Sequence, residues 1–549
     1  MNLFEQLKHA YSTFLQQNFG VNSTTAHSCT FELNVDEAKA QFGDISSNAA
    51  MILAKQLKNN PRALAQRIES GFKHDSIDKI EIAGPGFINI SLTQNAFNTI
   101  AQEIFKDKNQ FFVPSELQKQ HFNIEFVSAN PTGPLHFGHG RGGIIGDVLA
   151  KVLRFIGHDV TKEYYINDAG SQMLKLGNTL KIRCQQELGL EVQLPDEAYH
   201  GEYMITLAAA CIKEHGSSVV DQDISFFIAY AKKHMLEMIK QTLGLYGIHF
   251  DVWFSEKSLH DSGAIDEALE VLKERGYLYE KEGALWFKAT EFGDDKDRVV
   301  KKSTGELTYV AADIAYMREK IARGADHLIM TLGHDHHSYV VRLHALQQAL
   351  GLEKYPLDVI LYQLVKMKNE GQLVRMSKRA GNIVTLKDII EAVGTDVARF
   401  FFLNRKADAQ LEFDVALALK KTDENPVYYV QYAYVRTLSI LEKAAQELGI
   451  ANIESKEADH LGAAERMLLK KIITLKELLM AISHNHQTHL LTYYVMELAQ
   501  LFHNYYAHNR VLDSSNMAQS RARLLVITIL KDTLALALEL LGVSRPKKM

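Results

Sequence analysis

The run from residue 123 to residue 166 constrains the fold of this chain more than any other stretch. Residues 123–127 (N-I-E-F-V) have the composition of a buried strand, and residues 159–166 form a second strand-like run. Between them, apolar residues recur at helical spacing: Ile144, Ile145, Val148, Leu149, Val152 and Phe155. This β-loop-α-β order predicts an α/β fold in which a loop leads from a strand straight into a helix.

That loop, residues 128–140, reads S-A-N-P-T-G-P-L-H-F-G-H-G and places two histidines three positions apart. A helix that starts there offers free backbone N–H groups and the positive end of its dipole, and both attract phosphate. Gly138 lets a ligand approach the backbone, and the imidazoles of His136 and His139 can donate hydrogen bonds to phosphate oxygens. The loop therefore indicates a nucleotide site that stabilises charge on a phosphorus atom under attack.

A second motif, residues 375–379 (R-M-S-K-R), follows a predicted hairpin whose turn is residues 369–371 (N-E-G). A basic loop of this kind can close on a polyphosphate, although a basic stretch alone is usually a solvated surface. An isolated H-x-G-H sequence is also weak. The two motifs together, in this order along one chain, are specific.

With these two motifs the chain resembles the class I aminoacyl-tRNA synthetases, whose signatures are HIGH and KMSKS. Within that class it resembles the arginyl-tRNA synthetases over essentially its whole length. Family-like stretches outside the two motifs lie at residues 42–48, 83–89, 165–170, 250–255 and 425–433. Phe137 stands at the isoleucine position of HIGH, and the second motif keeps the central Met376-Ser377-Lys378 of KMSKS.

Patterning divides the chain into three blocks, and the resemblance gives each a role. Residues 1–105 mix helices with short strands and resemble an N-terminal α+β domain that grips the tRNA elbow. Residues 121–410 resemble a Rossmann-like catalytic domain with a helical insertion at about residues 169–249. Residues 420–549 are helical in pattern and resemble an all-α bundle that binds the anticodon.

The resemblance implies ATP-dependent activation of L-arginine to arginyl-adenylate, followed by transfer to the 3′-terminal adenosine of tRNA(Arg). It also implies that activation needs bound tRNA. The expected catalytic residues are His136, His139 and Lys378, and the expected ATP-binding set is His136, Phe137, Gly138, His139, Met376, Ser377 and Lys378. Magnesium is expected to arrive with ATP, whose phosphates supply many of its ligands. No resident metal is expected, because the adjacent residues 334–337 (H-D-H-H) cannot readily converge on one ion.

A guanidinium is planar and permanently charged, so carboxylates that accept its forked N–H groups recognise it best. Tyr309 and Asp313 are four residues apart and share one face of a helix, although such a pair is also typical of an exposed amphipathic helix. In the resembled family these two positions and Glu125 hold the arginine side chain. Residues expected near its α-amino group or carboxylate are Asn130, His139 and His336, and the loop residues Ser128 and Ala129 complete the arginine-binding set.

Hydrophobic residues make up 46% of the chain and charged residues 23%, which is ordinary for a globular enzyme. No apolar run is long enough to span a bilayer, and residues 1–19 resemble neither a signal nor a transit peptide. Cys29, Cys184 and Cys211 have neither metal-ligand nor disulfide spacing. We therefore expect a cytoplasmic protein, acting as a monomer, with no membrane or DNA partner.

The net charge of −5 gives no general affinity for RNA, so tRNA binding requires a local basic and aromatic surface. Candidates are Tyr428, Tyr429, Tyr432, Arg436, Arg510 and residues 545–549. Two other classes of protein share part of the pattern. A small-molecule cytidylyltransferase also uses an H-x-G-H loop but is much shorter. A synthetase-like RNA-binding module without catalysis would not need His136, His139 and Lys378 intact.

Overall fold

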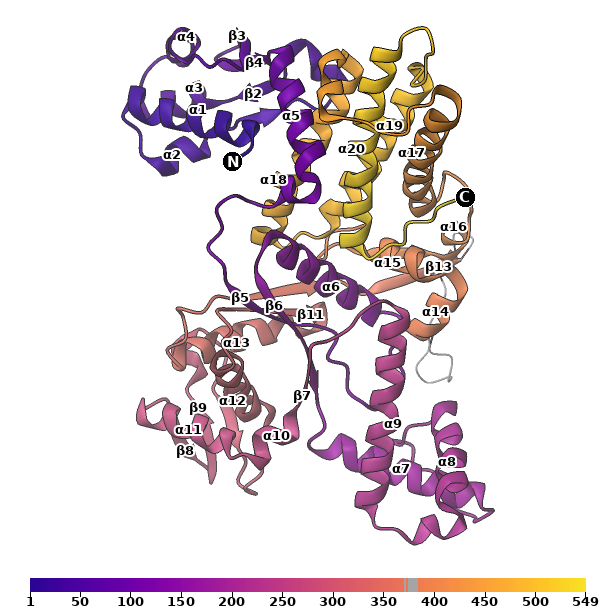
Figure 1. Ribbon diagram of the computed structural model, residues 1–549. Coiled ribbons are helices and arrows are strands. Elements are labelled where there is room, and N and C mark those ends of the chain that lie inside the picture. The colour runs from indigo at the N-terminus through magenta and orange to yellow at the C-terminus, as the bar shows by residue number, and fades with distance from the viewer. Residues whose placement is uncertain (370–371, 374–383) are drawn as a thin grey trace. The chain divides into compact units, whose positions relative to one another are not determined.

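The computed structural model describes residues 1–369, 372–373 and 384–549. The chain forms two compact units. The first comprises Met1–Leu117, Lys421–Asn485 and Leu490–Met549, and the second comprises Gln118–Lys420 and His486–His489. Figure 1 shows a bundle of long helices in the first unit and a sheet flanked by helices in the second. The predicted α/β fold with a helical C-terminal block is confirmed.

The second unit is built on a five-stranded parallel sheet with the order β12-β11-β5-β6-β7. Its strands are β5 (His121–Glu125), β6 (Asp159–Ile166), β7 (Val252–Ser255), β11 (His327–Gly333) and β12 (Leu357–Tyr362). The chain first adds β6 and β7 on one side of β5 and then β11 and β12 on the other, so the strand order reverses at β5. In sheets of this kind ligands bind at the carboxyl ends of the strands, beside the point of reversal.

Helix α6 (His139–Ile156) connects β5 to β6 and lies close to the sheet because glycines line its inner face. A Cβ atom on Gly146 would lie 2.3 Å from the ring of Phe126, and one on Gly142 would lie 2.6 Å from the ring of Tyr362. No larger residue fits at either position without a shift, so these glycines set how near the helix comes to the strand ends. Figure 1 shows α6 on one face of the sheet, and α12 (Tyr309–Ala322) with α13 (His337–Ala349) on the other.

A buried ion cluster fixes the middle of α6. Asp147 is fully buried, and its carboxylate lies 2.6 Å from the guanidinium of Arg399. The ammonium groups of Lys151 and Lys162 lie 3.0 and 3.2 Å from the same carboxylate. Burial opposes the ionisation of Asp147, but these cations, Arg399 above all, outweigh it and hold its pKa well below the usual range. The cluster joins α6 to β6 and to α15 (Thr395–Leu403).

Arg141 ties the first turn of α6 to a second, smaller sheet. Its guanidinium donates to the backbone carbonyls of Gln363, Lys406 and Ala409, each at 2.8 Å, and burial lowers its pKa to about 10. These carbonyls precede two strands of the sheet β14-β13-β15. Its strands are β13 (Val365–Asn369), β14 (Gln372–Leu373) and β15 (Leu411–Asp414). β13 and β14 pair antiparallel, which confirms the predicted hairpin, but Asn369, predicted in the turn, belongs to β13 and pairs with Gln372.

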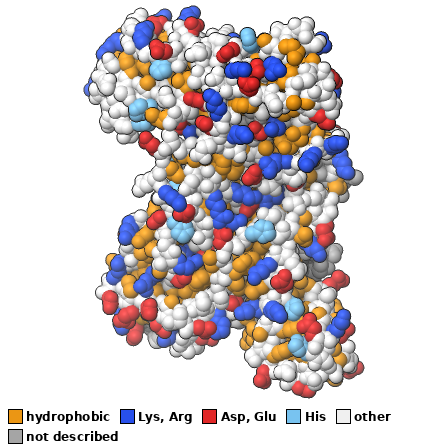
Figure 2. Space-filling view, viewed as in Figure 1, with side chains coloured by type: hydrophobic (Ala, Val, Ile, Leu, Met, Phe, Trp, Pro, Cys, Tyr) orange, Lys and Arg blue, Asp and Glu red, His pale blue; other side chains and the backbone are white. Residues whose placement is uncertain are grey.

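Between β6 and β7 the chain forms a helical insertion. It consists of α7 (Ser171–Glu187), α8 (Glu202–His215), η3 (Ser217–Asp221) and α9 (Ile224–Leu245). The insertion has an apolar core of its own, which includes Met173, Leu180, Met204, Phe227 and Met235. Figure 2 shows acidic, basic and hydrophobic side chains interspersed over the visible face of this part, without a field of one sign.

A small sheet and several short helices of the second unit pack near α12. An antiparallel sheet has the order β10-β9-β8, with β8 (Leu278–Lys281), β9 (Ala284–Phe287) and β10 (Arg298–Lys301). Two further helices, α14 (Leu386–Val393) and α16 (Val415–Ala418), contact α15 instead. The short helices near α12 are α10 (Glu256–Asp261), α11 (Ala264–Glu274), η4 (Ala289–Phe292) and η5 (His334–His336). Leu272, Phe287 and Ile314 belong to the apolar cluster that joins them.

The first unit combines an antiparallel sheet with helices from both ends of the chain. The sheet has the order β1-β2-β4-β3, with β1 (Glu32–Leu33), β2 (Ile45–Ser47), β3 (Ile77–Ala83) and β4 (Phe87–Leu92). Its N-terminal helices are α1 (Leu3–Phe19), α2 (Ser23–Ser28), η1 (Glu37–Phe42), α3 (Ala49–Leu57), α4 (Pro61–Gly71), α5 (Gln94–Asp107) and η2 (Lys108–Phe112). Its C-terminal helices are α17 (Pro426–Leu448), η7 (Ser455–His460), α18 (Ala463–Asn485), α19 (His489–His508) and α20 (Met517–Leu541).

Half-buried ion pairs join the two ends of the chain within the first unit. Lys470 on α18 lies 3.2 Å from Asp44, and Lys476 on the same helix lies 2.5 Å from Glu5 of α1. Together with the packing of α5 on η7 and α20, these contacts join segments that are distant in sequence into one compact unit. Among the helices that the structure describes, none combines the length and the apolar character needed to cross a membrane.

Candidate functional site

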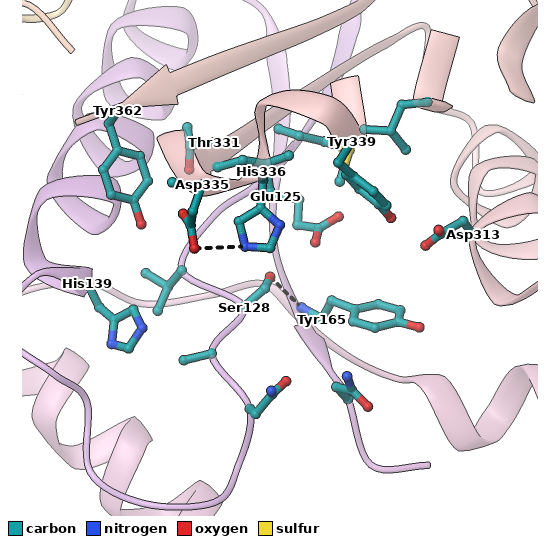
Figure 3. Close-up of a pocket in the computed structure, with 18 of the residues that line it drawn as sticks. Glu125, Ser128, His139, Tyr165, Asp313, Thr331, Asp335, His336, Tyr339 and Tyr362 are labelled. Atoms are coloured by element: carbon teal, nitrogen blue, oxygen red, sulfur yellow. Dashed lines mark hydrogen bonds and ion pairs between the residues drawn. The ribbon is translucent and has the colours of Figure 1, made fainter. Parts of the chain in front are cut away.

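A cavity of about 830 Å³ opens at the carboxyl ends of the parallel strands. The loop after β5, helix α12 and the turn η5 line it, and Figure 3 shows side chains from all three around it. The predicted site residues that line the cavity are Glu125, Ser128, Ala129, Asn130, His136, Gly138, His139, Tyr309, Asp313 and His336. The structure thus brings three separate stretches of the sequence to one site.

Four predicted residues are not among those lining the cavity. Phe137 is wholly buried beneath the loop, where its ring centroid lies 6.3 Å from that of Phe402. Its backbone N–H donates to the carbonyl of Val384, so Phe137 supports the loop from the core, and its side chain does not reach the cavity. Met376, Ser377 and Lys378 lie outside the described residues.

At one end of the cavity the two histidines lie at the start of α6 (Figure 3 labels His139). Nδ1 of His136 accepts a hydrogen bond from the backbone N–H of Gly138, and Nδ1 of His139 accepts one from the backbone N–H of His136, both at 3.1 Å. An accepting Nδ1 leaves the proton of a neutral imidazole on Nε2, so both rings carry an N–H donor there. The backbone N–H groups of residues 138–141 already donate within the chain, so the helix start does not offer the free N–H groups that the sequence predicts. The imidazole donors and the positive end of the α6 dipole nevertheless suit an anionic ligand such as phosphate.

The chain reaches this end through a sharp bend directly after β5. Val127 and Ser128 have φ values of 66° and 39°, which is the left-handed region that β-branched residues such as valine rarely adopt. The hydroxyl of Ser128 accepts a hydrogen bond from the backbone N–H of Tyr165 at 3.1 Å, drawn in Figure 3. The neighbouring strand β6 therefore holds the bend in place, and such held conformations are typical of functional sites.

Two carboxylates lie at the opposite end of the cavity. Asp313 comes from α12, beside Tyr165 and Tyr339 in Figure 3, and Glu256 is the first residue of α10. Oδ2 of Asp313 and Oε2 of Glu256 are shielded from water and have no hydrogen-bond partner among the described residues. A buried carboxylate oxygen without a donor is costly, so this end of the site is suited to a ligand rich in N–H groups.

Burial raises the pKa of both carboxyls. The pKa of Asp313 rises to about 7, because burial outweighs a hydrogen bond from Tyr339 and the positive charge of Arg342, and the charges of Glu256 and Glu125 raise it further. The pKa of Glu256 is also raised, because burial outweighs a hydrogen bond from Tyr165. A cation placed between the two carboxyls would lower both pKa values and be held by two ionised groups.

Glu125, the last residue of β5, lines the cavity, but its carboxylate already forms an ion pair with a lysine. The ammonium of Lys320 lies 2.5 Å from its Oε2 and 4.2 Å from the ring centroid of Tyr316. All three side chains are buried, so the pair is a fixed part of the wall. Asp313 and Glu256, which keep an unpartnered oxygen, are the carboxylates left to bind a cationic ligand.

Glu256, Asn167 and Tyr339 line the cavity although the sequence patterns do not single them out. Glu256 directly follows β7, and Asn167 directly follows β6. The rule that ligands bind at the carboxyl ends of parallel strands could have identified both, since each stands at or beside a family-like stretch. Tyr339 carries no such signal, because its contact with Asp313 depends on how α13 packs on α12.

Three family models match the chain. The class I (R) tRNA synthetase catalytic domain matches residues 100–411, and the DALR anticodon binding domain matches residues 430–549. The N-terminal domain of arginyl tRNA synthetases matches residues 5–92. Together these matches cover the α/β block that holds the cavity and the blocks on either side of it.

Similar proteins agree with the family models. The arginine–tRNA ligase 1 of Halalkalibacterium halodurans is 41% identical over 100% of both chains. The arginine–tRNA ligase of Caldanaerobacter subterraneus subsp. tengcongensis is 43% identical over 94% of each chain. The solved structure of Thermus thermophilus arginyl-tRNA synthetase has the same fold, with a TM-score of 0.77, 19% identity and 100% coverage of both chains. The resemblance seen in the sequence is thus confirmed, and the chain belongs to the arginyl-tRNA synthetase family of class I aminoacyl-tRNA synthetases.

Proposed function

We propose that this protein activates L-arginine with ATP and transfers it to tRNA(Arg), and that the cavity described above is where activation occurs. The observation that carries the proposal is the difference in chemical character between the two ends of the cavity. Carboxylates with unpartnered oxygens lie at one end, and imidazole donors with the positive end of the α6 dipole lie at the other. A cationic side chain and a polyphosphate fit these two ends. Arginine-dependent exchange of pyrophosphate into ATP tests the proposal.

The guanidinium of arginine binds between Asp313 and Glu256 in this proposal. Two carboxylates can accept several of its N–H groups at once, and each carboxylate contributes an oxygen that the described residues leave unpartnered. Tyr309 lies one turn before Asp313 on α12 and borders the same cavity. Asn130 and His336 also line the cavity, and we propose that they contact the α-amino group and the reacting carboxylate.

Activation needs no protein nucleophile. A carboxylate oxygen of arginine attacks the α-phosphorus of ATP, a P–O bond forms, and the bond to the bridging β-phosphate oxygen breaks, so that pyrophosphate leaves with the electron pair. His136 and His139 stabilise negative charge on the α-phosphate, and Lys378 neutralises the leaving pyrophosphate. The 2′-hydroxyl of the terminal adenosine of tRNA then attacks the adenylate carbonyl and releases AMP.

Magnesium enters this scheme with ATP. Among the described residues, no group of three or more His, Cys, Asp or Glu side chains could hold a metal ion. We propose the phosphates of ATP as the main ligands of magnesium, because phosphate oxygens suit this ion, with water completing its shell. The described cysteines are free and buried, as is usual in a reducing compartment, and we propose that the protein acts in the cytoplasm. We also propose that it acts as a monomer.

Arginine binding should weaken below about pH 7 because of Asp313. The carboxyl has a raised pKa of about 7 in the ligand-free protein, so below that pH arginine must displace a proton in order to bind. We expect the dissociation constant for arginine to rise ~10-fold from pH 8 to pH 6, as measured by calorimetric titration at constant ionic strength. Above pH 8 the affinity should level off, because Asp313 is already ionised.

The variant Asp313→Asn is the control for this pH dependence. It has no carboxyl at this position, so its weaker arginine binding should change little between pH 8 and pH 6. The histidines of the site are unchanged in the variant. An undiminished pH dependence in Asp313→Asn would assign the titration to another group.

An aromatic surface on the C-terminal bundle supports the proposal that the protein binds tRNA. Tyr432 on α17 and Tyr506 on α19 are 40% and 37% exposed, and the guanidinium of Arg436 lies 4.5 and 4.9 Å from their ring centroids. Arg436 also donates to the hydroxyl of Tyr432 at 2.7 Å and contacts Nδ1 of His503 at 3.1 Å. Exposed rings that share a guanidinium form a platform on which unstacked loop bases can stack.

Replacing Arg436 with alanine should lower tRNA affinity ~10-fold, because the platform loses both its cation and the contact that orders its rings. Filter binding of tRNA(Arg) at fixed salt measures the loss, and the KM for arginine should not change. Lys443→Ala is a matched control, since it removes one exposed cation from the same helix. Equal losses of tRNA affinity in the two variants would mean that α17 contributes only non-specific positive charge.

A further inference from the structure

The helical insertion contacts the carboxylate end of the cavity through an ion pair. Lys232 on α9 donates to Oδ2 of Asp168 at 3.1 Å. The side chain of Asp168 is 2% exposed, whereas that of Lys232 is 31% exposed. Asp168 stands two residues after β6, so the pair connects the insertion to the end of a central strand.

The other donors to Asp168 come from the start of α10. The hydroxyl of Ser255 donates to Oδ1 and Oδ2 of Asp168 at 2.9 and 2.7 Å, and the backbone N–H of Lys257 donates to Oδ1 at 3.0 Å. Ser255 is the N-cap residue of α10, yet its own side chain makes no capping bond. Asp168 therefore supplies the cap from a different segment of the chain.

Glu256 lies between the two residues that Asp168 holds. Because Ser255 and Lys257 are bonded to one buried carboxylate, the backbone of Glu256 is fixed on both sides. Tyr165 donates a hydrogen bond to its carboxylate, and Oε2 has no partner among the described residues. The direction in which Glu256 faces the cavity thus depends on Asp168.

We propose that Asp168 is a positioning residue for arginine recognition, and that Lys232 brings the helical insertion into that role. The inference rests on the proposed function, in which Glu256 binds the guanidinium. Lys232 gives Asp168 a charged hydrogen-bond donor from the insertion, 3.1 Å from Oδ2, and so helps to hold its carboxylate against Ser255 and Lys257. Without Lys232, Asp168 would keep only neutral hydrogen-bond donors, and the start of α10 would be held less firmly.

A second contact links the insertion to the same site. The hydroxyl of Tyr203 on α8 donates to the backbone carbonyl of Thr132 at 2.8 Å, within the loop that carries the two histidines. Gly133 lies directly under the Tyr203 ring, and a Cβ atom there would come within 2.9 Å of the hydroxyl oxygen. The insertion is therefore bonded near both ends of the cavity, and Lys232 provides its contact at the carboxylate end.

Steady-state pyrophosphate exchange by the full-length protein tests the inference, with arginine and ATP varied separately and tRNA(Arg) present. Asp168→Asn should raise the KM for arginine ~10-fold, while kcat and the KM for ATP change less than about twofold. Lys232→Met, which keeps most of the apolar stem, should raise the KM for arginine about threefold. The double variant should resemble Asp168→Asn, because Lys232 acts through Asp168.

Two matched variants control for charge and for helix stability. Lys233→Met removes the exposed neighbour of Lys232 on α9. Asp261→Asn removes an exposed carboxylate at the far end of α10, where it pairs with Lys257 at 2.6 Å. Both should leave the KM for arginine within about twofold of the starting value. Thermal unfolding of every variant shows whether a loss of activity results only from a loss of folded protein.

Glu256→Gln separates the inference from the proposed function. If Glu256→Gln raises the KM for arginine but Asp168→Asn and Lys232→Met do not, the inference is wrong and the proposed function stands. If Glu256→Gln leaves the KM unchanged, the assignment of the guanidinium pocket is wrong and the inference fails with it. Equal increases in the KM for arginine and for ATP in Asp168→Asn, with a lower Tm, would indicate a general structural role and contradict the inference.

Discussion

Asp313→Asn should weaken arginine binding by roughly 2–4 kcal/mol, which is about 30- to 1000-fold in affinity. The amide has nearly the shape of the carboxylate but no charge, so the guanidinium would keep only Glu256 as a charged partner. Citrulline has the same length as arginine and no charge, and its binding should change far less. The KM for arginine in pyrophosphate exchange and a competitive inhibition constant for citrulline measure the two effects.

The substitution should not unfold the protein, because it removes a charge that burial already disfavours. Glu319→Gln is the matched control on the same helix. Glu319 is not among the residues lining the cavity and pairs with Arg323 at 2.7 Å, so its replacement should change the KM for arginine less than about twofold. If Asp313→Asn still discriminates arginine from citrulline as well as the starting protein does, Asp313 is not the guanidinium ligand.

Lys378→Ala should lower kcat ~100-fold or more and leave arginine binding nearly unchanged. Its ammonium is needed most when charge develops on the departing pyrophosphate, so its loss affects the transition state more than the bound substrate. This prediction rests on the sequence motif and on family membership, since Lys378 lies outside the described residues. Single-turnover formation of arginyl-adenylate, together with calorimetric titration of arginine, separates the two effects.

Lys387→Ala is the matched control for Lys378→Ala. Its side chain is 55% exposed on α14 and lies 3.6 Å from Glu391, so its loss should change kcat less than about twofold. Near-normal turnover of Lys378→Ala would mean that another cation faces the pyrophosphate. A comparable decrease in both variants would mean that the surrounding positive charge matters more than either lysine.

The parts of the site that are local in sequence could be predicted. A strand, a glycine-containing loop and a helix follow one another within residues 121–156, and the spacing of Tyr309 and Asp313 fits the helix that the structure has there. The strand boundary is less accurate. Residues 126 and 127 continue the apolar run, but β5 ends at Glu125 because Val127 takes a positive φ. Composition does not reveal such a bend, since tertiary contacts impose it.

Features that depend on distant contacts could not be predicted. Glu125 is matched by Lys320, which lies 195 positions away on a helix whose packing no local pattern specifies. Likewise, Asp44 and Lys470 meet across 426 positions, so the first and last blocks of the chain form one compact unit. The predicted domain boundaries at residues 105, 121, 410 and 420 come from patterns along the chain. That the blocks between them fold separately stays a prediction.

Pyrophosphate exchange tests the central claim most directly. Purified protein is incubated with ATP and labelled pyrophosphate and with each amino acid in turn, in the presence and absence of tRNA(Arg). The account predicts that label enters ATP with arginine and tRNA(Arg) together, and that lysine and citrulline do not replace arginine. Exchange supported equally by lysine, or no exchange with any amino acid when tRNA(Arg) is present, would contradict the claim that this cavity activates arginine.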